Sequence, residues 1–207
     1  MKPKNKKDFW ILARRFLHEY MPLTRNLSGK SVEAYKQSLK SYLRFLEEEK
    51  GISNENVCFD CFSKNLVIEF ISWLKVNKYS AKSINLKLTA IRSLLKYCGS
   101  EDMELLGAYS DICNIRKMKE EKHPIMYLQP SATSAILSAF DVQTVKHRRN
   151  RMILILLYDS GARVQELSDL NRSSLHLEAS NPFITLVGKG RKTRNVPIME
   201  KTKRHLL

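Results

Sequence analysis

Two short β-type segments in the last quarter of the chain limit the folds open to it, because the segments upstream of them have helical spacing. Phe183 to Val187 and Asn195 to Ile198 are rich in branched and aromatic residues, which favour strands. Glycines at 188 and 190 lie between them and permit a sharp turn. The sequence therefore predicts a mainly α chain that carries a small antiparallel hairpin or sheet.

The turn of this hairpin is dense in positive charge, with Lys189, Arg191, Lys192 and Arg194 in or beside it. Four cations so close together repel one another unless an anion binds among them. The flanking glycines let the backbone of Lys189 approach a ligand closely. A solvated, charged turn that protects the edge of a sheet is the alternative. The turn alone leaves both interpretations open.

A helix break precedes the hairpin. Met152 to Leu157 is an unbroken apolar run, which predicts a helix that is buried on most sides. Tyr158 is expected to lie at the end of this buried helix. Gly161 is the predicted stop of that helix, because glycine accepts the left-handed conformation. A short helix then restarts, and Val164, Leu167 and Leu170 are expected to pack inward.

Arg163 and Glu166 share another face of this short helix, since they are three residues apart. Arg163 lies at the helix start, where backbone N–H groups favour an anion. A guanidinium there can bind a phosphate with two parallel hydrogen bonds. The alternative is a surface Arg–Glu ion pair of small energetic value. This segment by itself favours the ion pair.

The first half of the chain carries four helical patterns. We predict helices over residues 7–20, from a cap at Ser31 to about Lys50, over residues 63–76, and from a cap at Ser80 to Tyr97. Pro22 is expected to stop the first helix, while Gly51 and Gly99 end the second and fourth. A shorter helix is predicted over residues 103–111.

Positive charge gathers on two of these helices. The second carries Lys36, Lys40 and Arg44 at four-residue spacing, and its three glutamates at 47–49 are expected to point away from any DNA. The exposed surface of the fourth helix is expected to carry Lys82, Lys87, Arg92 and Lys96. A solvated helix face has the same pattern, and that reading is favoured for any single lysine.

A charged segment divides the chain. Residues 115–129 are dense in charge and contain Pro124, which indicates an interdomain linker. The predicted organisation is a helical domain over residues 1–114, this linker, and a second domain over residues 130–207. Pro130 stands at a favourable early position of the helix that opens the second domain and runs to Phe140.

The composition points to a polyanionic partner. The formal net charge is +15, from 36 Lys and Arg against 21 Asp and Glu, and nucleic acid is the simplest partner for such a balance. No apolar run approaches the length of a membrane-spanning helix. The basic N-terminus lacks the apolar stretch of a secretory signal. We therefore expect a cytoplasmic protein with no membrane partner.

Two of the four cysteines, Cys58 and Cys61, have the two-residue gap of a zinc or redox pair. No second pair or nearby histidine completes a zinc site. Reduced cysteines close to a hydrophobic core are the favoured interpretation. We therefore expect no metal.

The residues from Gly161 to Leu167 and from Val187 to Ile198 together resemble the tyrosine recombinase family, the phage-integrase type of DNA breaking-and-joining enzymes. The family pattern is a glycine, one residue, the first catalytic arginine, and then a glutamate and a leucine. A hairpin that carries the catalytic lysine follows. The resemblance implies that Arg163 and Lys189 are catalytic. We expect Glu166 to orient Arg163 and not to take part in the chemistry itself.

The resemblance extends over the upstream helices. It implies a four-helix, SAM-like core-binding domain, followed by the first part of an α+β catalytic domain. In that family the second and fourth helices meet DNA, which implies DNA contacts for their basic faces and for Arg191, Lys192 and Arg194 in the hairpin. The implied partners are double-stranded DNA, clamped by both domains, and other protomers in a synaptic complex of the full-length protein. No metal or other cofactor is implied.

The family's remaining functional residues lie beyond the hairpin: a His-x-x-Arg motif, a later His or Trp, and the nucleophilic tyrosine. All eight tyrosines here precede Arg163. We therefore expect a recombinase fragment that lacks its nucleophile and is limited to DNA binding. The alternatives are a non-catalytic DNA-binding regulator or accessory protein and, in third place, an RNA-binding helical module, although no recognisable RNA-binding motif is present.

Overall fold

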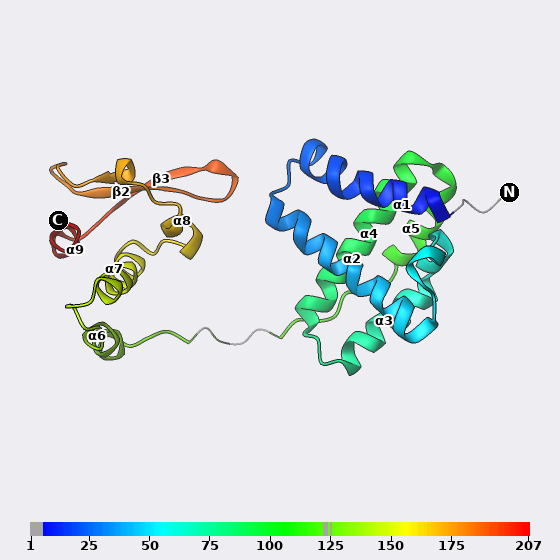
Figure 1. The fold of residues 1–207 in the computed structure, drawn as a ribbon, viewed down its shortest axis with the longest axis horizontal. Helices are drawn as coiled ribbons and strands as arrows, with labels where there is room; N and C mark the ends of the chain where they lie inside the picture. The colour runs from blue at the N-terminus through cyan, green and yellow to red at the C-terminus, as the bar shows by residue number, and fades with distance from the viewer. Residues whose placement is uncertain (1–5, 122–123, 125) are drawn as a thin grey trace. The chain divides into compact units, whose positions relative to one another are not determined.

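A computed structural model describes residues 6–121, 124 and 126–207, with the side chains of residues 6–8 and 189 outside the description. The chain forms two compact units, residues 1–123 and residues 124–207 (Figure 1). None of the helices in the described part of the chain combines the length and the apolar character needed to cross a membrane.

The N-terminal unit is helical. Its elements are α1 (Lys6–Arg15), a π-helical segment (Phe16–Thr24), α2 (Gly29–Lys50), 3₁₀ turns at Asn54–Asn56 and Phe59–Phe62, α3 (Lys64–Val76), α4 (Ala81–Glu101), a 3₁₀ turn at Met103–Leu105, and α5 (Leu106–Cys113). Serine hydroxyls cap α2, α3 and α4 by accepting the N–H three residues further on, at 3.3 to 3.4 Å. The caps are Ser28, Ser63 and Ser80, so the predicted cap at Ser31 is wrong and that at Ser80 is confirmed.

The predicted helix ends have different outcomes. Gly51 closes α2 in the left-handed conformation, with φ of 64°. Gly99 does not end α4 but lies buried within it. A Cβ at this position would come within 3.3 Å of the Leu106 backbone, so the glycine allows α4 and the start of α5 to pack closely. Pro22 does not stop the first helical stretch, which continues to Thr24 as a π-helix. In a π-helix each N–H bonds to the carbonyl five residues back instead of four, which makes a wider turn. The wider turn accommodates Pro22 inside the helical segment.

An aromatic cluster forms the core of this unit. Phe16, Tyr42, Phe62 and Phe70 are almost fully buried. The ring centroids of Tyr42 and Phe70 lie 4.9 Å apart in an edge-on arrangement, and the Tyr42 hydroxyl donates to the Cys61 carbonyl at 2.6 Å. Burial raises the pKa of the Tyr42 hydroxyl far above its usual value. Side chains of α2, α3 and α4 supply much of the hydrophobic core of this unit.

The segment that follows α5 is fastened to α4. The buried Asn85 side chain accepts the Met118 N–H at 2.9 Å and donates to the Met118 carbonyl at 3.0 Å. The same amide donates to the Glu120 carboxylate at 2.9 Å. Ile115 and Met118 also pack against the hydrophobic core. The first part of the predicted linker is therefore an integral part of the helical unit, whereas residues 122, 123 and 125 lie outside the described residues.

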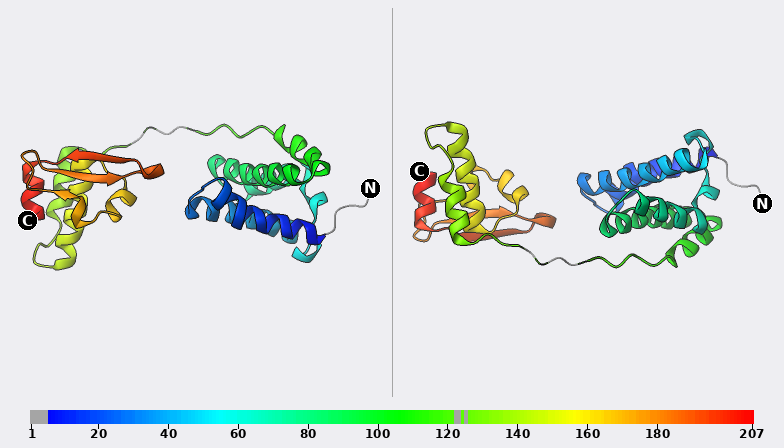
Figure 2. Two further views of the ribbon diagram at one scale, coloured as in Figure 1. Left: turned by 90° about the horizontal axis from the view of Figure 1, so that it is seen from above. Right: turned by 90° about the horizontal axis from the view of Figure 1, so that it is seen from below.

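The C-terminal unit combines helices with a small sheet. Its elements are α6 (Pro130–Ser138), α7 (Val145–Ser160), α8 (Val164–Ser168), a 3₁₀ turn at Arg172–Ser174, β1 (Leu175–His176), β2 (Phe183–Val187), a 3₁₀ turn at Lys189–Arg191, β3 (Thr193–Pro197) and α9 (Glu200–Leu206). The sheet order is β1-β2-β3 with both pairs antiparallel. Figure 2 shows α9 beside α7, on which it packs. The predicted fold class, mainly α with a small antiparallel sheet, is confirmed.

Few apolar side chains of this unit are fully buried. Ile184, Leu186 and Ile198 form its buried cluster. Within α7 only Leu156 is buried, so the expectation of a helix buried on most sides is wrong. The predicted inward packing of Val164 is also wrong, since this side chain is 72% exposed. Helical spacing correctly marks an apolar face here, but the described elements of the unit cover only part of it.

Candidate active site

Arg163 lies between two helices of the C-terminal unit. Gly161 ends α7 in the left-handed conformation, with φ of 58°, as predicted. Arg163 then takes an extended conformation and caps α8. Its side chain is 72% exposed. Its own backbone N–H is already occupied by Glu166, at 2.8 Å. The guanidinium, and not the amide of this residue, is therefore the group available to an anion.

The carboxylate of Glu166 is the centre of the site. Its side chain is only 4% exposed, although α8 is a short surface helix. One oxygen accepts Arg163 Nη1 at 2.7 Å and Arg194 Nη1 at 2.8 Å. The other accepts the Arg163 amide at 2.8 Å and Arg194 Nη2 at 2.7 Å. The predicted pairing of Arg163 with Glu166 is confirmed, but the carboxylate is buried and shared between two arginines, unlike a simple surface ion pair.

This arrangement perturbs the ionisation of both partners. Hydrogen bonds from the Arg194 side chain and from the Arg163 backbone hold the pKa of Glu166 well below its usual range. The carboxylate in turn raises the pKa of Arg194. Glu166 is therefore ionised at neutral pH and acts as a fixed anion that orients two cations.

The hairpin brings its cationic turn up to this carboxylate. Strands β2 and β3 pair from Phe183 with Pro197 to Val187 with Thr193. The Gly188 N–H closes the turn on the Lys192 carbonyl at 2.7 Å. A Cβ at Gly188 would lie 3.1 Å from Glu166 Oε1, so a larger residue here would require the carboxylate or the turn to shift slightly. Gly190 has φ of 77°, which glycine adopts readily.

The predicted cations of this turn separate into two groups. Arg191 and Lys192 are exposed. Arg194 is bound to Glu166 by two parallel hydrogen bonds. The Lys189 backbone lies in the turn, but its side chain lies outside the described residues. The geometry thus places the backbone that carries Lys189 next to the carboxylate that holds Arg163.

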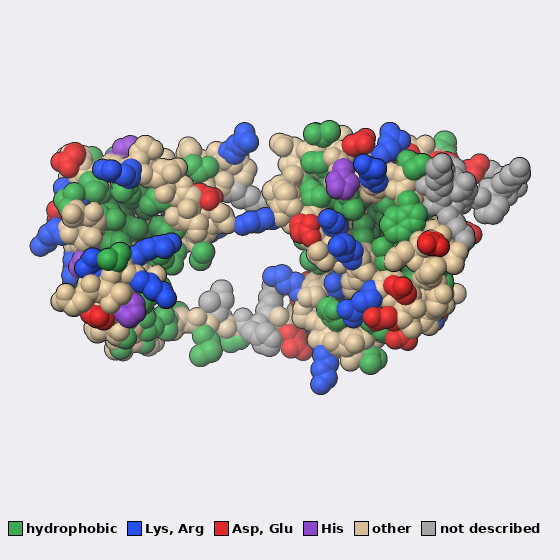
Figure 3. Space-filling view, viewed as in Figure 1, with side chains coloured by type: hydrophobic (Ala, Val, Ile, Leu, Met, Phe, Trp, Pro, Cys, Tyr) green, Lys and Arg blue, Asp and Glu red, His purple; other side chains and the backbone are tan. Residues whose placement is uncertain are grey.

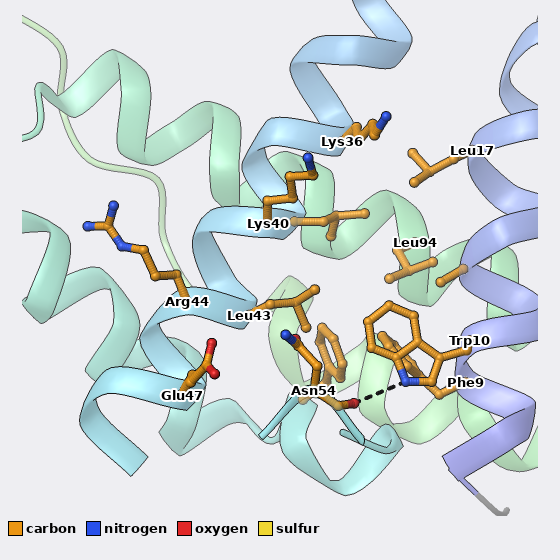
Figure 4. Close-up of a pocket in the computed structure, with 13 residues that line it drawn as sticks. Phe9, Trp10, Leu17, Lys36, Lys40, Leu43, Arg44, Glu47, Asn54 and Leu94 are labelled. Atoms are coloured by element: carbon orange, nitrogen blue, oxygen red, sulfur yellow. Dashed lines mark hydrogen bonds between the residues drawn. The ribbon is translucent and has the colours of Figure 1, made fainter. Parts of the chain in front are cut away.

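The predicted basic stripe of α2 borders an apolar groove of 520 Å³ between α1 and α2. Lys36, Lys40 and Arg44 follow one side of this groove, with Trp10 opposite (Figure 4). Figure 3 shows hydrophobic side chains beside Lys and Arg side chains in this unit. Glu47 lines the same groove. Arg44 lies over the Trp73 ring and pairs with Glu48 at 3.3 Å.

The predicted cations of α4 do not form one exposed set. Lys82 and Lys96 are exposed. Lys87 is half-buried over the Tyr79 ring, and burial lowers its pKa. Arg92 is also half-buried and donates to the carbonyls of Ile112, Cys113 and Ile115, at 3.2 and 3.3 Å for the first two. Its guanidinium therefore holds the end of α5, a structural role that the sequence did not indicate.

The cysteine pair lies in the helical unit. The Sγ atoms of Cys58 and Cys61 are 4.0 Å apart and both thiols are free. Cys61 is buried in the core, as expected, and burial raises its pKa. Within the described residues, no group of three or more His, Cys, Asp or Glu side chains is placed to hold a metal ion.

This chain is similar in sequence to known proteins over the helical unit and over most of its length. Residues 14–102 match the phage integrase N-terminal SAM-like domain. The chain is 26% identical to tyrosine recombinase XerC of Staphylococcus aureus, over 86% of this chain and 56% of that protein. Residues 14–102 thus carry a phage integrase SAM-like domain, and the chain is similar to tyrosine recombinases. It is also 26% identical to tyrosine recombinase XerD of Listeria monocytogenes, over 90% of this chain and 60% of that recombinase.

Another relative is the putative integrase/recombinase y4rD of Sinorhizobium fredii, 24% identical over 94% of this chain and 70% of that protein. Two solved structures share the fold of this chain. The Tn1549 transposon integrase, in complex with a circular intermediate DNA, has a TM-score of 0.64 at 15% identity, covering 95% of this chain and 62% of that one. The XerH site-specific recombinase bound to palindromic difH substrate has a TM-score of 0.63 at 17% identity, covering 99% and 61%. The chain thus spans less than two thirds of most of these proteins.

Proposed function

We propose that this chain supplies the DNA-binding surface and two catalytic cations of a site-specific recombinase or integrase. The observation that carries the proposal is the shared Glu166 carboxylate, which joins Arg163 to the hairpin of Lys189. Phosphoryl transfer needs preplaced cations where charge develops on the phosphate. The relatives whose structures resemble this one include recombinases in complex with DNA.

In the proposed reaction a tyrosine attacks the scissile phosphate, and the 5′ oxygen of the broken strand leaves. Arg163 stabilises the charge on the non-bridging oxygens, because its exposed guanidinium is oriented by a fixed carboxylate. Lys189 gives the departing oxygen its proton as a general acid. Glu166 takes no proton in the reaction but keeps Arg163 in place. The substrate is double-stranded DNA, and other protomers complete the synaptic complex.

The proposed binding is tested by titrating duplex DNA with residues 1–207 across a salt series. Phosphate neutralisation predicts a log–log slope of roughly −0.9 for each contact. Lys40→Ala removes a predicted contact on α2 and should make the slope shallower by about that amount. Lys64→Ala removes an exposed cation from α3, outside the predicted surface, and serves as the matched control. A slope near zero for the unmodified chain would exclude this function.

A purely DNA-binding role is the second candidate for residues 1–207, since all their tyrosines precede Arg163. Tyr158 does not end a buried helix as expected but is 61% exposed. An unactivated phenol is nonetheless a poor nucleophile at neutral pH, with a reference pKa of about 10. We expect no covalent adduct with a nicked suicide substrate on denaturing electrophoresis. A shifted band that Tyr158→Phe abolishes would identify Tyr158 as the nucleophile.

A further inference from the structure

The cations of the hairpin differ in the direction they face. Leu186 of β2 pairs directly with Arg194 of β3, and opposite residues in an antiparallel pair share one face of the sheet. Leu186 is fully buried, so Arg194 is on the inner face. Its neighbours Thr193 and Asn195 are exposed on the other face. The register of the sheet, independently of any side-chain contact, places Arg194 on the same face as the buried Leu186, although its side chain stays 39% exposed.

The contacts of Arg194 agree with this register. Its two terminal nitrogens bind the two oxygens of Glu166 at 2.8 and 2.7 Å, a fork-to-fork geometry that lysine cannot reproduce. Gly188, at the other end of the turn, leaves room for the carboxylate. Both ends of the turn therefore meet one buried anion.

We propose that Arg194 is a positioning residue, which fixes the Lys189 turn on Glu166 and does not contact DNA phosphate. This role replaces the DNA contact expected from sequence and rests on the proposed function. Glu166 then sets the spacing between the two catalytic cations, because it binds Arg163 from α8 and Arg194 from β3. The exposed Arg191 and Lys192 remain as the cations of this turn that neutralise phosphate.

Three variants of residues 1–207 separate positioning from phosphate contact. Arg194→Lys keeps the charge but loses the fork, Gly188→Ala changes no charge but crowds Glu166, and Lys192→Ala removes an exposed cation from the same turn. Two readouts are measured for each: the salt slope of DNA binding and the hydrogen exchange of the Gly188 and Arg191 amides, which bond across the turn.

We expect Arg194→Lys and Gly188→Ala to speed exchange of these amides at least roughly tenfold, because charge-assisted pairing is lost or strained. Both should keep the salt slope of the unmodified chain. Lys192→Ala should show the reverse, with unchanged exchange and a slope shallower by roughly 0.9. Normal exchange in Arg194→Lys would overturn the proposal, since a point charge would then suffice.

Arg194→Ala gives the other decisive result. A slope shallower by roughly 0.9 with unchanged exchange would make Arg194 a phosphate contact and overturn its positioning role. Fast exchange with an unchanged slope supports that role. If the unmodified chain shows no salt-dependent binding, the proposed function fails, while the exchange data still decide whether Arg194 fixes the turn. Because both tryptophans lie in the helical unit, their fluorescence verifies that each variant is folded there.

Discussion

The two units of the chain are held together by different means. The helical unit packs large aromatic side chains such as Phe62 and Phe70 into a continuous core. The C-terminal unit buries a much smaller apolar cluster around Ile184 and Leu186, and its hairpin is tied to α8 by the buried Glu166. Apolar packing tolerates changes of pH and salt, whereas an ion-held turn depends on protonation and exact geometry. The part of the chain proposed to do chemistry is thus the part held by charge.

The two units can be distinguished by a variant that impairs cleavage but leaves DNA binding intact. Lys189→Ala should have the largest effect of the variants considered, and that effect should be on the cleavage rate. In a recombinase that includes this chain and the nucleophile, DNA binding should stay nearly normal. Cleavage should slow by roughly a hundred- to ten-thousand-fold, as expected when a general acid is lost. Single-turnover cleavage of a nicked substrate measures the rate.

A sulfur at the bridging 5′ position provides the control for this variant, because a thiolate leaves without needing a proton. That substrate should restore most of the lost rate. If Lys189→Ala stays equally slow on it, Lys189 acts in some way other than by proton transfer.

The helical unit should respond most to a hole in its core. Phe70 is 1% exposed and its ring lies within 6.1 Å of those of Tyr42, Phe45 and Trp73. Phe70→Ala should lower the free energy of unfolding by about 3–5 kcal/mol. Urea unfolding followed by tryptophan fluorescence measures this, since Trp10 and Trp73 both lie in this unit. Exchange of the hairpin amides should not change, and a parallel loss there would show that the units do not fold independently.

Several features of the C-terminal unit could be predicted from the sequence, because they depend on local spacing. The three-residue interval of Arg163 and Glu166 predicts their pairing, and Gly161 its helix stop. The inward direction of Arg194 also has a local signal, since it is two residues from the apolar Val196 on the same strand. The high density of cations in the turn hides this signal, because all four cations share one short segment.

Other features depend on contacts between distant segments and leave no local signal. The bonds from Asn85 to Met118 span 33 residues, and nothing in the charged segment around Met118 indicates that it docks. Arg92 is one of several cations on α4, and only the position of the α5 C-terminus distinguishes it from Lys96. The exposure of Val164 likewise follows from which elements reach α8, which periodicity cannot show.

Asn85 offers a smaller test, because it is a polar contact within the core-held unit. Asn85→Ala leaves the Met118 amide and carbonyl without their partner and should cost about 1–3 kcal/mol. Trypsin should then cut faster after Arg116, Lys117 and Lys119, which the docking restrains. Lys75, exposed near the end of α3, serves as the reference cleavage site. Unchanged cutting after Arg116, Lys117 and Lys119 would mean that Ile115 and Met118 hold the segment by apolar packing alone.

The smallest effect is expected from pH in the neutral range. Glu166 has a folded pKa below its unfolded value of about 4.3. Its contribution to stability is therefore fully present above that unfolded value and is lost as pH falls towards the folded one. Hairpin amide exchange, corrected for its intrinsic pH dependence, should stay constant from about pH 5 to pH 8 and rise only in stronger acid.

Glu166→Gln is the matched control for this titration, because it keeps the shape but removes the titrating group. Its hairpin should exchange faster at every pH and show no acid-dependent step. The amides of the helical unit should be unaffected by the substitution, since the described core of that unit is built from apolar and aromatic side chains. A step near pH 6 to 7 in the unmodified hairpin would instead implicate a histidine. In that case the hairpin would not be held by the carboxylate alone.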